Sequence, residues 1–383
     1  MYHLGAINRK RMAQRNTLTS FSPSSARKLE HPQAIGETGM RLKDKIAIVV
    51  GAGQSPGEGM GNGRATVLRF AEEGAKVLAV DNNIRSAEET VAMAQARGGE
   101  CAAFEADVCN EKTLAAMADA ARRRWGRIDI LHYNVGVSIA GGDAPLDEIT
   151  EAAFDRIAAI NLRGAIMACK HVLPTMRAQR SGVITMISSV AAWEQYPNVV
   201  YKATKAGMIA FTQQIAIQNA EFGVRANVIL PGLMDTPMAV DTRARASGKP
   251  RAEVAAARNA RVPLRHRMGT AWDVANAALF LASDEADFIT GVALPVDGGA
   301  LVHINREGRI WGVDTTIRAY SALIRRVTCS AVAAQGRFAS GGARICRTGS
   351  LTEGRSRPFS HGVPAFLRVL HCCRVAQHPA IAL

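Results

Sequence analysis

The sequence has few aromatic residues, and it lacks the cysteine pairs, long apolar runs and signal segment that mark metal-binding, membrane and secreted proteins. Aromatic residues make up only 5% of the 383 residues, and the seven cysteines form no C-x-x-C pair. Without such a pair or a histidine cluster, the sequence offers no metal-binding spacing, so we expect no metal. No apolar run reaches the length that crosses a bilayer, so we expect no membrane partner. Residues 1–39 lack the apolar stretch of a secretory signal, which favours a reducing, cytoplasmic location.

Acidic residues are too few to balance the basic ones, and the formal net charge is +14. The excess sits at the two ends of the chain, because residues 41–302 carry 29 basic and 28 acidic side chains. Basic terminal runs are usually solvated flanks, whereas a nucleic-acid-binding domain concentrates its charge on the folded body. The distribution therefore argues against a nucleic-acid partner.

What the chain has is a regular alternation of short apolar runs and helix-period segments between residues 45 and 302. This alternation predicts an α/β fold, a doubly wound, Rossmann-type parallel sheet of about seven strands in a single domain, with disordered terminal extensions. The expected strands are Ile46–Val50, Lys76–Val80, Ala102–Ala106, Ile128–His132, Val183–Ile187, Ala226–Leu230 and Val292–Val296. The expected helices are Arg64–Glu73, Ser86–Arg97, Glu111–Arg124, Glu151–Arg177, Tyr201–Ala220 and Ala271–Leu281.

The two ends of the chain have a different character from this body. Residues 1–39 are polar and rich in Arg and Ser, which predicts a disordered extension upstream of Met40 or, as the lesser alternative, a mitochondrial targeting segment. Residues 303–383 have no lysine and little periodicity. They are expected to be a disordered basic tail or a gene-model artefact. The predicted domain therefore spans residues 40–302.

The first strand leads into a glycine-rich turn that runs from Gly51 to Gly63. A turn of this kind between a strand and a helix lets backbone N–H groups and the positive end of the helix approach a pyrophosphate. Asp81 closes the second strand, where a carboxylate can accept hydrogen bonds from both ribose hydroxyls of adenosine and would repel a 2′-phosphate. The pair of signals predicts a dinucleotide site that takes NAD, with NADP as the less favoured cofactor.

A tyrosine and a lysine four residues apart lie on one predicted helix. Positions four apart share a helix face, so Tyr201 and Lys205 can address one site. Free tyrosine has a pKa of about 10, and a nearby lysine cation favours its phenolate. This pairing predicts a proton donor and acceptor for an alcohol.

In this order, the motifs resemble those of the short-chain dehydrogenase/reductase family over residues 41–302. The family turn T-G-x-x-x-G-x-G is matched best by Gly51, Gly61 and Gly63, although Gly53, Gly57 and Gly59 also fit its spacing. The resemblance implies cofactor contacts from residues along five loops. These residues are Gly51, Gly53, Gly61, Asn62, Gly63, Asp81, Asp107, Val108, Asn134, Gly136, Pro231, Gly232 and Thr236, together with Tyr201 and Lys205.

The same resemblance implies a catalytic set built on the Y-x-x-x-K pair. A serine after the fifth strand would hold the substrate oxygen, and strand register favours Ser189, whereas the spacing back from Tyr201 favours Ser188. Asn161 matches the family's N-x-x-G and would hold a water of a proton relay beside Lys205, while a local helix kink is the alternative reason for an asparagine there. The loop and helices between Pro231 and Arg267 would cover the substrate.

These features imply an NAD-dependent oxidoreductase that interconverts a small secondary alcohol and a ketone. Family members commonly assemble through the two longest helices, so a homotetramer or homodimer is expected. Two alternatives remain open: a regulator that binds NAD(H) without turnover, and a non-redox epimerase or dehydratase that uses bound NAD.

Overall fold

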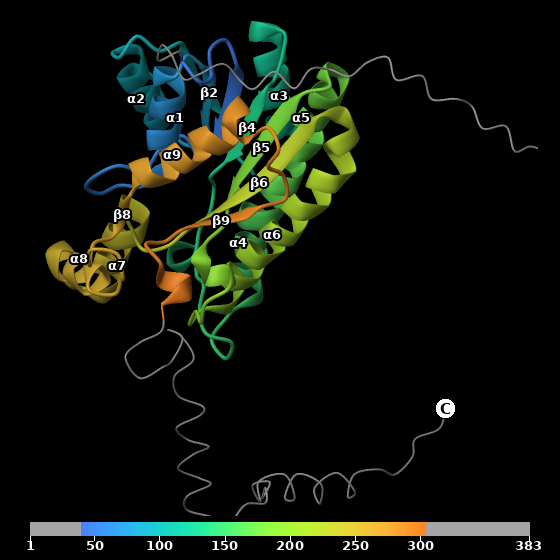
Figure 1. Cartoon of the computed structure of the whole chain (residues 1–383). Coiled ribbons are helices and arrows are strands. Elements are labelled where there is room, and N and C mark those ends of the chain that lie inside the picture. The colour runs from blue at the N-terminus through green and yellow to red at the C-terminus, as the bar shows by residue number, and fades with distance from the viewer. Residues whose placement is uncertain (1–39, 304–383) are drawn as a thin grey trace, which may run out of the picture. The chain divides into compact units, whose positions relative to one another are not determined.

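A computed structural model describes residues 40–303 of the chain, and their core is one parallel sheet (Figure 1). All seven strands run in the same direction, in the order β3-β2-β1-β4-β5-β6-β9. The predicted doubly wound, Rossmann-type sheet of about seven strands is therefore confirmed. The strands are β1 (Ile46–Val50), β2 (Lys76–Asp81), β3 (Cys101–Glu105), β4 (Ile130–Tyr133), β5 (Gly182–Ile187), β6 (Val224–Pro231) and β9 (Ala293–Val296).

Helices cover both faces of this sheet, and each face has its own apolar core. On one face, α3, α5 and α6 pack against the sheet, with Leu114, Cys169 and Met208 among their buried residues. On the other face, α1, α2 and α9 contribute Leu68, Val91 and other residues to a second core. The helices are α1 (Asn62–Glu72), α2 (Ile84–Gln95), α3 (Glu111–Trp125), α4 (Glu151–Ala158), α5 (Gly164–Gln179), α6 (Val199–Asn219), α7 (Thr242–Ser247), α8 (Arg251–Asn259) and α9 (Ala271–Ala282).

The strand order creates a crevice between β1 and β4. The chain winds outward in one direction from β1 through β2 and β3, and in the other direction from β4 onward. Loops that follow the two central strands therefore diverge at their carboxyl ends, which is where doubly wound sheets bind ligands. Gly51 follows β1 and Asn134 follows β4, so both loops border this crevice.

Two regions differ from the sequence prediction in detail. The single helix expected over residues 151–177 is divided, because a π-helical turn at Ala159–Arg163 separates α4 from α5. The predicted cover after Pro231 consists of a second π-helical segment (Pro237–Asp241), helices α7 and α8, and a two-stranded pairing of β7 (Met234–Asp235) with β8 (Gly269–Thr270). A π-turn lies within an otherwise continuous helical sequence, so a periodicity search over residues 151–177 finds one helix.

A histidine in the central strand makes the stability of the fold depend on pH. His132 on β4 is fully buried, and burial lowers its pKa to about 3. Its Nδ1 lies 2.8 Å from the Thr185 hydroxyl, whereas Nε2 has no hydrogen-bond partner among the described residues. In the unfolded chain this ring titrates near pH 6.5, so only the unfolded state gains a proton as the pH falls from 6.5 towards 3.

We therefore expect His132→Leu to flatten the acid loss of stability. The His132 contribution falls by about 1.4 kcal/mol per pH unit below 6.5, or about 2 kcal/mol between pH 7 and pH 5. Urea unfolding of the variant at both pH values should show a correspondingly smaller decrease than the parent. Substitution of the exposed His266 by Asn should leave the decrease unchanged, and an equal decrease in the His132 variant would contradict the assignment.

Within residues 40–303, no helix is both long and apolar enough to cross a membrane. The predictions for residues 1–39, and for the tail beyond His303, concern segments outside the described residues.

Candidate active site

The loops at the carboxyl ends of the strands enclose a cavity of about 460 Å³. Most of the residues that the sequence analysis selected line this single cavity, although they come from positions up to 185 residues apart. The lining includes Gly51, Gly53, Gly61, Asn62, Gly63, Asp81, Asn134, Gly136, Ser188, Ser189, Tyr201, Lys205, Pro231, Gly232 and Thr236. Asp107, Val108 and Asn161 are not among the lining residues.

The glycine-rich turn approaches its neighbours so closely that two of its residues must be glycine. A Cβ on Gly63 would lie 1.8 Å from the Gly51 carbonyl oxygen, and Gly51 itself has a φ of +83°. The Asn134 amide donates a 3.0 Å hydrogen bond to the same Gly51 carbonyl and ties the loops after β1 and β4 together. Of the alternative glycines, Gly53 also lines the cavity, whereas Gly57 and Gly59 do not.

The first turn of α1 presents unused polar groups to the cavity. Its N-cap residue is Gly61, so no side chain caps the helix, and the first turn carries no acidic residue. Buried Asn62 Oδ1 has no hydrogen-bond partner among residues 40–303. Free N–H groups at a helix N-terminus suit a phosphate, and an unpaired buried oxygen suits a donor on a ligand. These groups fit the pyrophosphate and ribose of a dinucleotide.

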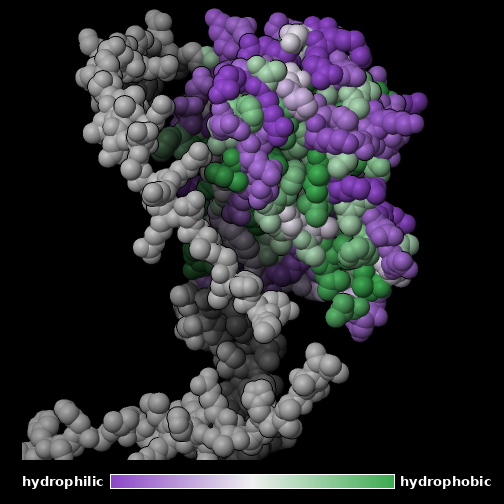
Figure 2. Space-filling model, turned by 90° about the vertical axis from the view of Figure 1, so that its right-hand side faces the viewer, coloured by the Kyte–Doolittle hydropathy of each residue, from purple (hydrophilic) through white to green (hydrophobic). Residues whose placement is uncertain are grey.

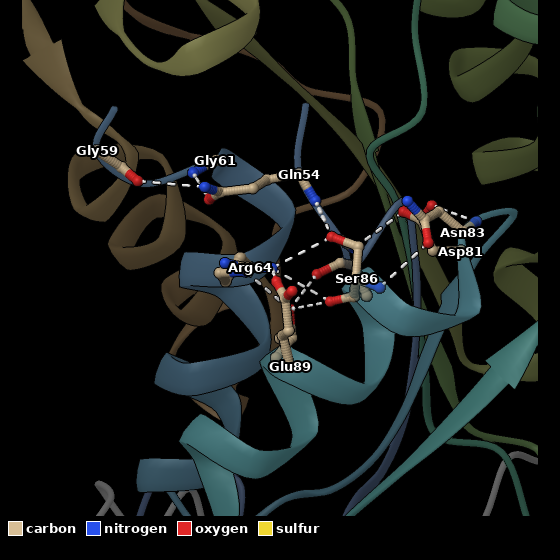
Figure 3. A network of polar contacts seen from close by, with 11 residues as sticks. Gln54, Gly59, Gly61, Arg64, Asp81, Asn83, Ser86 and Glu89 are labelled. Carbon is tan, nitrogen blue, oxygen red and sulfur yellow. Dashed lines mark hydrogen bonds and ion pairs between the residues drawn. The ribbon is translucent and has the colours of Figure 1, made fainter. Parts of the chain in front are cut away.

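Asp81 sits at the far end of the cavity in a network that reaches the glycine-rich turn (Figure 3). Its Oδ2 accepts a 2.9 Å hydrogen bond from Gly53 N, and its Oδ1 accepts one of 3.0 Å from Asn83 N. Ser86 Oγ accepts a hydrogen bond from Gln54 N and another from Arg64. Arg64 is buried and also donates hydrogen bonds to Thr90 and Glu89, so its guanidinium is already paired with a carboxylate.

Tyr201 and Lys205 project from one face of α6 into the opposite end of the cavity. Lys205 Nζ lies 5.7 Å from the centre of the Tyr201 ring and donates a 2.7 Å hydrogen bond to the Ile187 carbonyl at the end of β5. Burial raises the pKa of Tyr201 to about 12 and lowers the pKa of Lys205 to about 7. Burial therefore disfavours the charged form of each group, and a lysine cation and a phenolate would stabilise one another.

The two candidate serines have different surroundings. Ser188 is buried, and its hydroxyl donates a 2.7 Å hydrogen bond to the Lys205 carbonyl within α6. Ser189 is partly exposed, and its hydroxyl forms a hydrogen bond with the Tyr201 side chain, which offsets part of the rise in the tyrosine pKa. Of the two, Ser189 is the serine whose side chain meets the phenol, so the arrangement favours the register argument for Ser189.

Asn161 lies behind the cavity in the π-helical turn, and the Asn-containing kink considered from the sequence is present. Its side-chain amide accepts a hydrogen bond from Val137 N and donates to the Val137 carbonyl and to Thr204 Oγ1. Thr204 in turn donates to the Tyr201 carbonyl. Asn161 thus joins the loop after β4 to the helix that carries the tyrosine, while its predicted contact with a relay water stays a prediction.

Asp107 and Val108 do not line the cavity, and their predicted contacts with a cofactor stay predictions. The Asp107 carboxylate accepts a hydrogen bond from Cys109 N, and the Asp107 carbonyl accepts one from Thr113 at the start of α3. Val108 is buried in the core beside Gly164. Thr236 lines the cavity, and its Oγ1 accepts a hydrogen bond from Ala239 N.

Asp143 is a functional candidate that the sequence analysis missed. Its carboxylate accepts hydrogen bonds from Val200 N and Tyr201 N and so caps the first turn of α6 from a distant loop. The α6 N-cap residue, Asn198, makes no such bond itself. Asp143 therefore fixes the backbone of the tyrosine, and it precedes Tyr201 by too many residues for any local spacing to reveal the contact.

A second group of missed residues forms the substrate side of the cavity. Tyr196 stacks near Tyr201, with ring centres 5.6 Å apart, and its hydroxyl lies 3.2 Å from Ser138 Oγ. Arg243 and Arg258 line the same wall from α7 and α8. No motif marks these positions, since they come from loops and short helices of mixed composition.

The loop between Gly53 and Gly61 also contacts this cover of the cavity. Asp241 Oδ1 accepts a 3.1 Å hydrogen bond from Glu58 N, and Arg245 donates one of 3.2 Å to the Pro56 carbonyl. Arg251 then pairs with Asp235 and Asp241. The lengthened glycine loop and the cover after β6 are therefore bonded to one another.

Comparisons with known proteins agree with this arrangement. The family model described as "Enoyl-(Acyl carrier protein) reductase" matches residues 57–301. A relative from Sinomonas cyclohexanicum, cis-4-hydroxycyclohexanecarboxylate dehydrogenase, is 37% identical over 68% of this chain and 98% of its own length.

Solved structures give the same result. A putative short-chain dehydrogenase/reductase from Burkholderia xenovorans is 41% identical, with a TM-score of 0.63 over 68% of this chain and 97% of its own. The structure of 7α-hydroxysteroid dehydrogenase with NADH and 7-oxo glycochenodeoxycholic acid is 32% identical, with a TM-score of 0.60 over 68% of this chain and 96% of its own. The sequence motifs, the sheet order and these matches together establish that the chain belongs to the short-chain dehydrogenase/reductase family of oxidoreductases.

Proposed function

We propose that this protein is an NAD-dependent oxidoreductase that interconverts a secondary alcohol and a ketone. The observation that carries the proposal is the joint position of Tyr201, Lys205 and Ser189 at one end of a cavity whose other end holds Asp81. Relatives named as dehydrogenases of hydroxylated compounds, and one neighbouring structure that contains NADH, support the reaction class. When bound, the nicotinamide would supply the acceptor for the hydride.

The residues of this chain would exchange a proton with the substrate and hold the substrate in position. Ser189 would hold the alcohol oxygen beside the phenol, and Tyr201 would take its proton as the carbon–hydrogen bond breaks. Lys205, in its cationic form, would favour the phenolate. Asp143 and Asn161 would keep the backbone of α6 and the loop after β4 in position. In the reverse direction Tyr201 would donate the proton.

The polar network around Asp81 supports NAD rather than NADP. A carboxylate at this place repels a 2′-phosphate, and the engaged side chain of Arg64 offers it no free cation. We expect Asp81→Ala to lower the ratio of NAD to NADP affinity by about 10- to 100-fold, because charged hydrogen bonds of this kind contribute about 1.5–3 kcal/mol. Titration of the reduced cofactors by fluorescence measures both affinities, and an unchanged ratio would assign ribose recognition to another residue.

The experiment that tests the reaction is absorbance at the NADH band. The full chain would be incubated with NAD or NADP and a panel of cyclic and linear secondary alcohols. Growth of the band with NAD supports the proposal. Tight NADH binding without turnover across the panel would favour the regulator, and conversion of a substrate without net change in the band would favour an epimerase or dehydratase.

We also propose that the protein assembles as a homotetramer or homodimer through α5 and α6, with a cytoplasmic location as a further prediction. Figure 2 shows the face to the right of Figure 1, where apolar surface lies among charged residues. Exposed apolar side chains include Phe154 on α4 and Ile217 on α6, on helices of that side of the sheet. Sedimentation velocity of the full chain measures the mass of the assembly.

A further inference from the structure

The wall of the cavity beyond Tyr201 contains a buried cation that no carboxylate of the described residues contacts at ion-pair distance. Arg258 on α8 is only 8% exposed and lines the cavity. Its Nε donates to the Met268 sulfur at 3.4 Å, a weak acceptor, and no carboxylate of residues 40–303 forms an ion pair with it. Burial, together with the nearby charges of Arg243 and Arg261, lowers its pKa to about 10. An unpaired charge of this kind is costly to bury unless a ligand compensates it.

A second guanidinium extends this positive wall towards the reacting groups. Arg243 on α7 lines the same cavity, donates a 3.0 Å hydrogen bond to the Ala239 carbonyl and lies 3.5 Å from the Tyr196 hydroxyl. Its charge acts on both Tyr201 and Arg258. The described residues provide no carboxylate partner for Arg243 either, so the two cations face the space where a substrate would lie.

The acidic residues of this region are engaged with other cations. Asp235 and Asp241 both pair with Arg251, at 2.5 Å and 3.3 Å. Glu194 is the carboxylate that shares the cavity wall, and burial raises its pKa. The positive charges of Arg261 and Lys202 act on it more strongly than that of Arg258 does. The region therefore has more positive than negative charge available to a ligand.

We propose that the substrate carries a carboxylate, which Arg258 and Arg243 bind while Tyr201 and Ser189 address its hydroxyl or ketone. This inference rests on the proposed function, because it places the substrate carboxylate in the part of the same cavity that lies beyond the reacting groups. It predicts hydroxy acids and oxo acids, with the acid group away from the reacting carbon, as the substrate class. The planar guanidinium of Arg258 matches a carboxylate by paired hydrogen bonds.

The test is calorimetric titration of the full chain, saturated with NADH, with cyclohexanecarboxylate and with its neutral analogue cyclohexanecarboxamide. The reduced cofactor is chosen because its ring carries no positive charge that could attract an anion. We expect the carboxylate to bind about 10- to 100-fold more tightly than the amide, the range for hydrogen bonds to a charged partner. Arg258→Met should remove this preference and leave the NADH affinity unchanged.

Arg267→Met is the matched control, because it removes the same charge from an exposed position outside the cavity wall. It should retain the preference for the carboxylate. Equal affinity for the two probes, no binding of either probe to the NADH complex, or a preference that survives in the Arg258 variant would overturn the proposal. A loss of NADH affinity in the Arg258 variant would do so as well, since it would assign the arginine to the cofactor. Failure of the parent chain to bind NADH would instead count against the proposed function.

Discussion

Replacing Tyr201 by phenylalanine is expected to lower kcat by about 10²- to 10⁴-fold, the range that a positioned acid or base contributes. The substitution removes only the hydroxyl oxygen and leaves the ring in its place beside Tyr196. Because this oxygen is the atom that would exchange the proton with the substrate, the loss should appear in kcat with little change in NADH affinity. Initial rates at saturating substrate, followed at the NADH band, measure the effect.

Tyr196→Phe provides the comparison within the same cavity. Its hydroxyl contacts Ser138 and Arg243, and these neutral or weak bonds contribute at most about 1.5 kcal/mol, or about tenfold. A loss in this variant as large as that of Tyr201→Phe would mean that the proton passes through Tyr196. Full activity of Tyr201→Phe would remove Tyr201 from the mechanism.

Adding one methyl group at Gly63 is expected to have the second large effect. The new Cβ would lie 1.8 Å from the Gly51 carbonyl oxygen and 2.7 Å from the Asn134 amide nitrogen. Neither is the end of a long flexible side chain free to move away, so α1 must shift from the turn by about 1 Å or more. Because a misplacement of about 1 Å can lower a reaction rate about 100-fold, we expect a loss of NADH affinity of similar size in Gly63→Ala.

Gly59→Asn is the control within the same loop. Gly59 also has a positive φ, of +87°, but a Cβ there would meet no atom within 4 Å, and asparagine tolerates this backbone conformation. Its NADH affinity should stay within about twofold of the parent, as expected for an open surface position. Comparable losses in both variants would mean that the whole loop, rather than the contact between Gly51 and Gly63, determines binding. Circular dichroism of Gly63→Ala separates weak binding from unfolding.

The sheet could be predicted from the sequence because its strands are buried on both faces. Continuous apolar runs such as Ile46–Val50 stand out between amphipathic helices, and the alternation implies parallel strands. The helix over residues 151–177 was predicted as one element because Asn161 and its neighbours keep good helix-forming residues on both sides of the π-turn. The reason for that turn is tertiary: the amide of Asn161 bonds Val137 across the cavity wall.

The predicted site residues that line the cavity could be selected from the sequence because they lie in short motifs next to regular elements. Spacing back from Tyr201 favoured Ser188 and strand register favoured Ser189, because the length of the loop before α6 is not fixed by any motif. Strand register determines which side chain points towards Tyr201, and in the structure Ser189 is the serine that acts on the phenol, while its catalytic role stays a prediction. Asp143 and Arg258 could not be predicted, as their contacts depend on loops and short helices whose positions only the folded chain defines.

The bonds between the lengthened glycine loop and the cover of the cavity have a thermodynamic consequence. Glu58 and Pro56 on the loop are held by Asp241 and Arg245 on the cover. A ligand that orders one of these segments also favours the conformation of the other, and by linkage the effect is reciprocal. The dinucleotide and the substrate should therefore strengthen each other's binding even where they do not touch, and by the same factor whichever of them binds first.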